Sequence, residues 1–249
     1  IISPILFSVY LDSLLDKLVE SKLGCNIGSM FVGVLAYAYD IVLLAPSASA
    51  MRSMLKQCEN FASEFNIVFN ASKSKCLFCP AKRCPRITDK DNAQFYINGC
   101  LVEYVDQWPH LGHFISSDLD DKYDILHRRN VLAGQINNVL SYFGALDSFI
   151  KVRLLNTYCS SMYGSVLWDL NHHAIESVCT TWRRGLRHVF GLPYNAHSYL
   201  LPSLSCSLPV LDELAKRTVV FIQKCLSSDG ALVNFVASHS VGYSNMFST

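Results

Sequence analysis

Two short apolar runs around a polar connection constrain the fold of this chain more than any other feature. The runs are 31–36 (FVGVLA) and 41–44 (IVLL), and 37–40 (YAYD) joins them. Apolar runs of this length with so short a polar connection favour a β-hairpin with a tight turn. We therefore expect 36–40 at the tip of an antiparallel hairpin, with strands close to 30–36 and 40–45.

Helical periodicity lies on both sides of this hairpin. Ser3 and Pro4 form a helix-start signal, and apolar residues follow at helical spacing up to Leu18. The same spacing returns from Met51 to Phe65. These patterns predict one helix from about residue 3 to about 21 and a second at 47–66. A short strand is expected at 75–78.

A second hairpin is predicted where 95–97 (FYI) and 101–102 (LV) flank the turn 98–100 (NGC). The segment 110–115 could add a third strand to it. From about residue 121 the pattern is helical. We expect helices near 121–143, 147–167, 171–190 and 208–227, with prolines 193, 202 and 209 punctuating the last loop.

The composition is that of a globular chain without a membrane helix. Of 249 residues, 51% are apolar and 16% charged, which suits a domain whose partner surfaces have been removed. The richest apolar stretch, 30–46, contains Asp40 and is shorter than the roughly 20 residues that span a bilayer. The first residues carry no Met, basic region or cleavage signal. We expect a truncated, intracellular protein, cytoplasmic or nuclear, that is not secreted and not bound to a membrane.

The ten cysteines are scattered without regular spacing, which favours a reducing compartment and free, mostly buried thiols. Cys76, Cys79 and Cys84 form the one cluster. No second pair and no histidine at ligand spacing completes a zinc site, so strand and loop cysteines are the favoured interpretation.

Charge is segregated along the chain, although the formal net charge is only +1. Segment 61–90 contains six basic and two acidic residues, and segment 91–125 contains seven acidic residues and one basic residue. Segment 126–200 contains seven basic and three acidic residues. Two basic blocks around an acidic one are compatible with a nucleic-acid channel. Ordinary charged helix faces are the alternative.

Several segments, taken in order, resemble the reverse transcriptases of non-LTR (LINE-type) retrotransposons. In the first half of the chain they are 2–10 (ISPILFSVY), like the helix behind the incoming nucleotide; 36–40 (AYAYD), like the Ala-Tyr-Ala-Asp-Asp box; and 70–75 (NASKSK), like the stretch whose lysine approaches the triphosphate. Further on, 110–115 (HLGHFI) is similar to the primer-grip hairpin, and 163–168, 182–187 and 191–193 are similar to thumb and post-thumb segments. Each piece is weak alone, but the order is specific and covers residue 1 to about 209.

This resemblance implies an α+β fold: an incomplete right-hand polymerase palm at 1–118, then an α-helical thumb and extension at 119–249. It implies RNA-templated DNA synthesis with an RNA template, a DNA primer, Mg²⁺ and no small-molecule cofactor beyond dNTP. Carried over residue by residue, it implies Asp40 as a metal ligand, Lys73 and Lys75 at the triphosphate, and Leu111 and Gly112 in the primer grip.

The sequence departs from the family at Tyr39, which stands where the first Asp of the box belongs. Nucleotidyl transfer uses two Mg²⁺ ions about 4 Å apart that carboxylates must bridge. In the family, one Asp comes from an earlier strand, which we expect to precede Ile1, and two come from the hairpin. Only Asp40 remains, and a phenol is a poor Mg²⁺ ligand. We expect the chain to be catalytically inactive; a non-catalytic nucleic-acid-binding remnant and an inert translated relic are the alternatives.

Other candidate residues have structural interpretations beside functional ones. The acidic cluster of Asp118, Asp120, Asp121 and Asp124 is interpreted as a helix start capped by Ser117 and Asp118, rather than a cation site. His172 and His173 are interpreted as surface or cap residues, and Tyr158, Tyr163, Trp168 and Trp182 as core rather than base-stacking residues. Arg183, Arg184 and Arg187 are candidates for nucleic-acid binding through phosphate contact, with Arg183 and Arg187 on one helix face; a solvated helix is the alternative.

Overall fold

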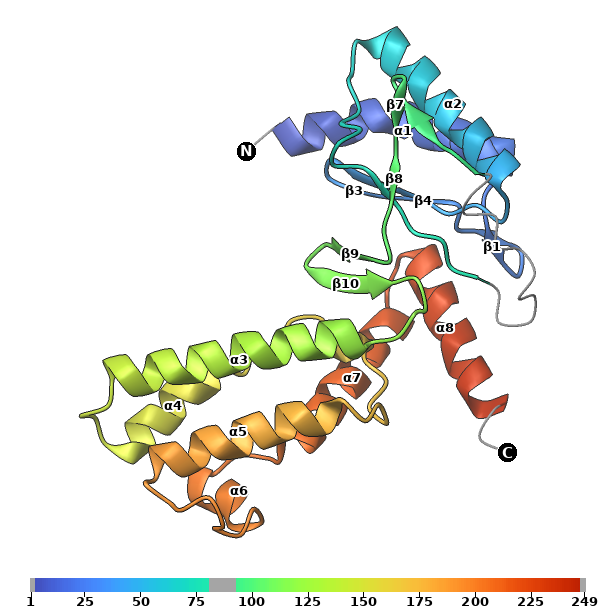
Figure 1. Cartoon of the computed structure of the whole chain (residues 1–249). Helices are drawn as coiled ribbons and strands as arrows, with labels where there is room; N and C mark the ends of the chain where they lie inside the picture. The colour runs from blue at the N-terminus through green and yellow to red at the C-terminus, as the bar shows by residue number, and fades with distance from the viewer. Residues whose placement is uncertain (1–2, 81–92, 247–249) are drawn as a thin grey trace. The chain divides into compact units, whose positions relative to one another are not determined.

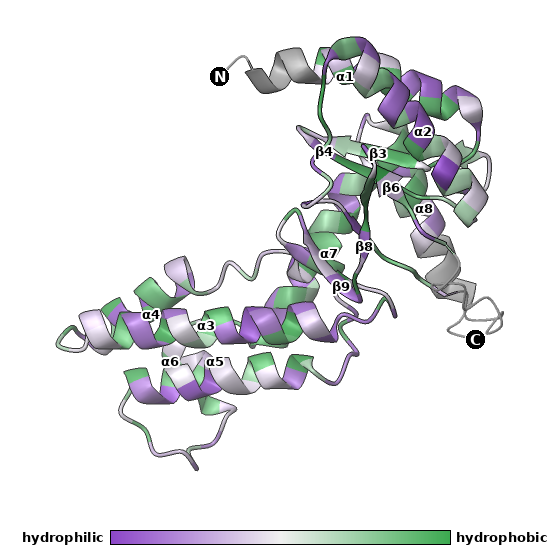
Figure 2. Cartoon of the chain, turned by 45° about the horizontal axis from the view of Figure 1, so that its top comes forward, coloured by the Kyte–Doolittle hydropathy of each residue, from purple (hydrophilic) through white to green (hydrophobic). Residues whose placement is uncertain are grey.

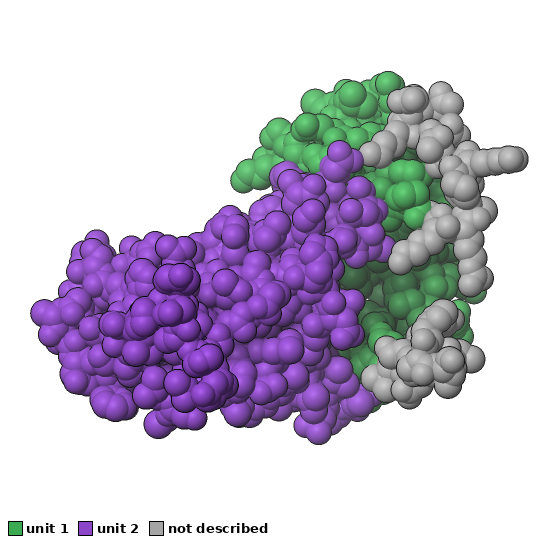
Figure 3. Space-filling model, turned by 60° about the horizontal axis from the view of Figure 1, so that its bottom comes forward, with its two compact units in different colours: residues 1–105, 228–249 green, residues 106–227 purple. Residues whose placement is uncertain are grey.

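The computed structural model describes residues 3–80 and 93–246. The chain separates into two compact units: unit 1 comprises 1–105 with 228–249, and unit 2 comprises 106–227 (Figure 3). This division differs from the predicted one at 118/119. The hairpin that precedes residue 118 belongs with the helices of unit 2, and the last helix of the chain belongs with unit 1.

Unit 1 begins with the predicted order of helix, hairpin and helix. Its elements are α1 (Ser3–Ser21), β1 (Asn26–Ile27), β2 (Met30–Phe31), β3 (Val34–Tyr37), β4 (Asp40–Leu43) and α2 (Ala48–Phe65). The Ser47 side chain accepts a hydrogen bond from the Ala50 amide and caps α2, which ends at Asn66 in the left-handed conformation. Both predicted helices and the β3–β4 hairpin are confirmed (Figure 1).

One face of the β3–β4 hairpin is buried against α1 and α2. Val34, Ile41 and Leu43 pack on a core made by three leucines of α1 and by Met54, Cys58 and Phe61 of α2. Figure 2 shows the hydrophobic character of β3. Fully burying one such leucine contributes about 2 kcal/mol. This packing fixes which face of the hairpin is left to solvent.

The strands of this hairpin are shorter than predicted because two backbone segments meet at Gly24 and Gly33. A methyl group on Gly33 would lie 2.5 Å from the Gly24 Cα, so side chains are excluded there. The Gly33 carbonyl still accepts from the Leu44 amide at 2.8 Å, but the preceding Met30 and Phe31 pair with β1 instead.

The rest of unit 1 is built from short strands and one unpredicted helix. β5 (Lys75–Cys76) pairs in parallel with β8 (Glu103–Tyr104), and β6 (Tyr96–Ile97) pairs with β7 (Cys100–Leu101) around a two-residue turn. β5 is shorter than predicted, and the turn is one residue shorter. α8 (Ala231–Met246) returns to unit 1, where Phe235 reaches the β1–β2 turn at Gly28.

Unit 2 is a hairpin followed by helices. Its elements are β9 (Gln107–His110), β10 (His113–Ser116), α3 (Lys122–Tyr142), α4 (Ser148–Tyr158), the 3₁₀ turn η1 (Ser165–Leu167), α5 (Ile175–Val189), α6 (Leu200–Ser205) and α7 (Val210–Leu226). α3 and α5 lie side by side (Figure 1), and Gly185 lets the helices approach until Ile136 occupies the space of its missing Cβ. Their buried residues form one core with α4, α6 and α7.

Three predictions for unit 2 are corrected. The segment 110–115 adds no strand to the second hairpin, because 107–116 forms its own antiparallel pair. The helix predicted at 147–167 ends at Tyr158, and the chain turns at Gly164, whose φ is +81°. α6 falls where prolines suggested a loop; Pro202 lies in its first turn, where a missing amide proton costs no helical bond.

Across the part of the chain that the structure describes, no helix is long and apolar enough to cross a membrane.

The contact of Gly24 with Gly33 leads to a stability prediction. Gly33→Ala should lower the free energy of unfolding by about 1–3 kcal/mol, because the new methyl group meets backbone that cannot move independently. Gly134→Ala is the control: this α3 glycine has open space around it, so alanine should be neutral or stabilise by up to about 1 kcal/mol. Urea unfolding of the two variants measures both effects; equal stabilities would contradict the proposed contact.

Candidate functional site

The tip of the β3–β4 hairpin carries Tyr39 and Asp40. Tyr37 pairs with Asp40, and Ala38 and Tyr39 make the turn between them, with Ala38 at a φ of 51°. Tyr37, Tyr39 and Asp40 are all exposed. The prediction that 36–40 forms the tip of an antiparallel hairpin is therefore confirmed.

Asp40 lies on the hairpin face that points away from the core. Side chains alternate between the two faces of a strand, so Asp40 and Val42 share one face, while Ile41 and Leu43 share the buried one. On β3, Leu35 and Tyr37 belong to the same outer face as Asp40, and Leu35 is 41% exposed. The carboxylate thus stands at the edge of an exposed, partly apolar strand surface.

The hairpin offers one carboxylate to a metal ion. Mg²⁺ requires near-octahedral oxygen coordination, usually from more than one protein or substrate group. Among the residues that the structure describes, no three His, Cys, Asp or Glu side chains gather as metal ligands. Asp40 and the Tyr39 phenol therefore do not fit a site for two ions.

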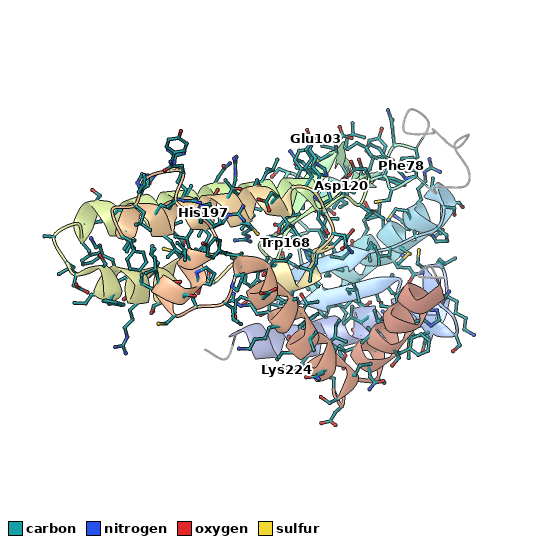
Figure 4. The ribbon with its side chains drawn as sticks, turned by 90° about the horizontal axis from the view of Figure 1, so that it is seen from below. Phe78, Glu103, Asp120, Trp168, His197 and Lys224 are labelled. Carbon is teal, nitrogen blue, oxygen red and sulfur yellow. The ribbon has the colours of Figure 1, made fainter. Side chains whose placement is uncertain are left out.

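The two lysines predicted at the triphosphate have different surroundings. Lys75 on β5 forms an ion pair with Glu103 of β8, with Nζ 2.6 Å from Oε2; Glu103 is labelled in Figure 4. Lys73 is exposed in the turn before β5, where the Asn70 side chain accepts a hydrogen bond from the Lys73 amide at 3.1 Å. Lys73 is the more accessible of the two.

The predicted primer-grip residues form the tip of the β9–β10 hairpin. Leu111 and Gly112 are the two turn residues, with φ of 48° and 78°. Two-residue hairpins need such left-handed conformations, but a branched apolar side chain rarely adopts them. Both residues are exposed.

The Asp124 carboxylate lies beside this turn. In the sequence it belongs to the acidic cluster at 118–124. Asp124 is fully buried and accepts hydrogen bonds from the Phe114 amide at 3.0 Å and from the Trp168 indole at 2.8 Å. Trp168 is labelled in Figure 4. His113 Nδ1 lies 3.1 Å from Asp124 Oδ2 without hydrogen-bond geometry, and Arg128 Nε lies 3.9 Å from Oδ1. A signal existed: Asp124 precedes the buried Leu132 by eight residues, which places both on one helix face.

The other three carboxylates of the cluster organise the chain before α3. Asp118 accepts from the Ser116 hydroxyl at 2.5 Å, Asp120 from the Lys122 amide at 2.6 Å, and Asp121 from the Asp169 amide at 2.7 Å. The predicted cap at 117–118 is wrong, because α3 begins at Lys122.

The histidine pair lies in the turn before α5, and His173 is exposed, as predicted for a surface residue. His172 Nδ1 accepts a hydrogen bond from the Ala174 amide at 3.1 Å, and His172 Nε2 lies 3.1 Å from Asp120 Oδ1. The rings of His172 and His173 lie against each other.

The four aromatic candidates divide into two kinds. Trp168 and Trp182 are buried, as predicted for core residues. Tyr158 and Tyr163 are 62% and 58% exposed, so the core interpretation is wrong for both. The Tyr163 hydroxyl donates to the Leu111 carbonyl at 2.9 Å.

The arginines of α5 also differ in accessibility. Arg183 pairs with Glu176, and Arg187 donates to the Ala196 carbonyl and the Ser198 hydroxyl, each at 2.8 Å. Arg184 is exposed. Arg183 and Arg187 are therefore both bound to other residues of this chain. Of the three arginines, Arg184 presents the most accessible guanidinium.

No disulfide joins two of the nine described cysteines. Only Cys58, Cys159 and Cys179 are buried, so the prediction of mostly buried thiols is wrong. Burial raises the pKa of Cys58 to about 11, as its place in the core requires. Cys84, part of the weighed zinc cluster, lies outside the described residues.

Comparison with known proteins adds one relative. No family model matches the chain. Over 114 residues the chain is 27% identical to the Retrovirus-related Pol polyprotein from type-2 retrotransposable element R2DM of Drosophila melanogaster. The aligned stretch covers 45% of this chain and 11% of that polyprotein. This likeness supports a retrotransposon-related origin for the chain.

The Ser116 hydroxyl leads to a prediction about pH. Its hydrogen bond to Asp118 holds the pKa of that carboxyl below its ordinary value of 3.8. A lowered folded-state pKa stabilises the fold above the ordinary value, and this contribution is lost as the pH falls through the folded-state pKa. In Ser116→Ala, an NMR titration should find the Asp118 pKa raised; Ser63→Ala is the control. An unchanged Asp118 titration in Ser116→Ala would contradict the assignment.

Proposed function

We propose that this chain is a segment of a non-LTR retrotransposon reverse transcriptase whose altered catalytic hairpin does not support DNA synthesis. The observation that carries the proposal is the β3–β4 hairpin, which is packed on α1 and α2 and bears Tyr39 and Asp40 at its tip. The likeness to a retrotransposon polyprotein supports the same assignment. The activity proposed for the family is RNA-templated DNA synthesis.

Within this proposal, unit 1 corresponds to part of the polymerase palm and unit 2 to the thumb. A hairpin with one face on two helices and one face exposed suits a palm, since the exposed face must meet substrate. A helical bundle around α3 and α5 suits a thumb. RNA template and DNA primer are the proposed partners.

The proposed loss of catalysis follows from charge. When bound, Mg²⁺ ions lower the pKa of the attacking hydroxyl and neutralise the triphosphate. Asp40 supplies one negative charge, while Tyr39 supplies a neutral phenol. Metal charge and positioning provide most of the rate in phosphoryl-type transfers. With one carboxylate in place of two at the hairpin tip, the rate of DNA synthesis should therefore be lower by many orders of magnitude.

Primer extension tests this proposal. The 249-residue chain should give no detectable extension with Mg²⁺ or Mn²⁺, and Tyr39→Asp alone should not restore it, because two carboxylates on one turn cannot surround two ions. Asp40→Ala is the control for contaminating polymerase. Template-dependent extension by the unmodified chain that disappears in Asp40→Ala would show that another acid completes the site.

Nucleic-acid binding without catalysis is the second candidate function, and the exposed Arg184 and Lys73 favour it. The chain should bind an RNA–DNA primer–template with little sequence preference, and affinity should fall steeply as salt rises. Arg184→Ala should reduce the slope of log K against log salt by about one phosphate contact. Arg183→Ala should change it less, because Glu176 already pairs with Arg183.

A binding titration from low to high salt measures these slopes. Equal slopes for Arg184→Ala and the unmodified chain would remove Arg184 from the interface. No binding even at low salt would leave the chain as a relic without nucleic-acid function.

A further inference from the structure

We propose that Asp124, Arg128 and Tyr163 are positioning residues that hold the turn of Leu111 and Gly112 for contact with a nucleic-acid backbone. The inference rests on the proposed function for its ligand. It rests on contacts within unit 2 for its mechanism. All of these residues belong to that one compact unit.

Both carbonyl groups of the turn are held from the helical side. The Tyr163 hydroxyl donates to the Leu111 carbonyl at 2.9 Å, and the Arg128 guanidinium donates to the Gly112 carbonyl. The two donors support each other, because the guanidinium carbon of Arg128 lies 5.4 Å from the centre of the Tyr163 ring. The turn is therefore fixed at two successive peptide groups.

The buried carboxylate of Asp124 anchors these donors and the strand after the turn. It accepts from the Phe114 amide, which fixes β10 two residues beyond Gly112. It also attracts the Arg128 guanidinium, whose Nε lies 3.9 Å away. The Trp168 indole also donates a hydrogen bond to the Asp124 carboxylate and holds it in place. Asp124 thus acts on the turn through Arg128 and Phe114.

Gly164 permits this close assembly. A methyl group there would lie 2.8 Å from His113 Nδ1 and 3.8 Å from Asp124 Oδ2, and the positive φ of Gly164 also disfavours any side chain. The segment that carries Tyr163 can therefore approach the β9–β10 hairpin closely only with glycine next to it.

The conformation of Leu111 shows that the turn is constrained. A leucine at a φ of 48° is strained, and such strain persists only where the surroundings over-determine the backbone. Leu111 is 42% exposed, so burial of its side chain does not account for this conformation. The two-residue turn requires a left-handed conformation at Leu111, and the hydrogen bonds at the two carbonyls hold the turn in it.

The constrained turn presents chemistry that suits a phosphate group. Within the described ranges, the amides of Leu111 and Gly112 donate to no protein acceptor. The Arg128 guanidinium lies 4.0 Å from the position of a Cβ on Gly112, so a positive charge that is shared with Asp124 lies beside the two donors. Amide donors beside a cation are a common way to bind phosphate oxygens.

A single-atom change at Tyr163 tests the inference. Tyr163→Phe removes the hydroxyl that holds Leu111 and keeps an exposed ring; Tyr158→Phe is the matched control on α4, with a ring of similar exposure. We would measure amide hydrogen exchange at 111–113 and the Kd for an RNA–DNA primer–template at one low salt concentration. Tyr163→Phe should speed exchange at the turn and weaken binding about fivefold, the effect of one lost hydrogen bond. Tyr158→Phe should change neither.

A second variant separates positioning from charge. Arg128→Lys keeps the positive charge but loses the planar fork that reaches the Gly112 carbonyl. Affinity should fall while the salt dependence of binding stays unchanged. If the unmodified chain binds and Tyr163→Phe matches it in exchange or in affinity, this inference is overturned while the proposed function stands. If the unmodified chain does not bind at low salt, the proposed function is overturned and the inference with it.

Discussion

The packing of one hairpin face against two helices is the constraint on which the candidate catalytic site depends. Because side chains alternate along a strand, burial of Ile41 and Leu43 against α1 and α2 determines that Asp40 faces outward. A shift of the pairing by one residue would bury the carboxylate and expose the core residues. The strand pattern therefore keeps Asp40 on the outer face of the hairpin, next to Tyr39 in the turn.

Unit 2 depends on a different interaction, the burial of the Asp124 carboxylate. Removing a charge from water is costly unless partners replace the water, and the Phe114 amide, the Trp168 indole and the Arg128 guanidinium do so. All three partners come from separate parts of the chain. A single buried charge thus joins the β9–β10 hairpin, α3 and the segment before α5, which explains why it need not be a metal ligand.

The sequence predicted elements with strong periodicity and missed features set by tertiary contacts. The helices at 3–21 and 47–66 and the hairpin tip at Asp40 were predictable because apolar spacing or a short turn specified each one. The strand limits near Gly33 were not, because a glycine contact between distant segments decides them. In the candidate site, the position of Asp40 was predictable, whereas the burial of Asp124 was hidden among neighbouring acids that serve as turn residues.

Photo-crosslinking is the most direct test of the central proposal, that the β3–β4 turn and the β9–β10 turn each contact primer and template. An RNA–DNA primer–template carrying photoreactive bases would be bound to the full chain, irradiated and mapped by peptide mass spectrometry. The account predicts cross-links to peptides containing the β3–β4 turn at Tyr39 and the β9–β10 turn at Leu111, reduced by unlabelled duplex. Cross-links confined to other peptides, or none under conditions where binding is measured, would contradict it.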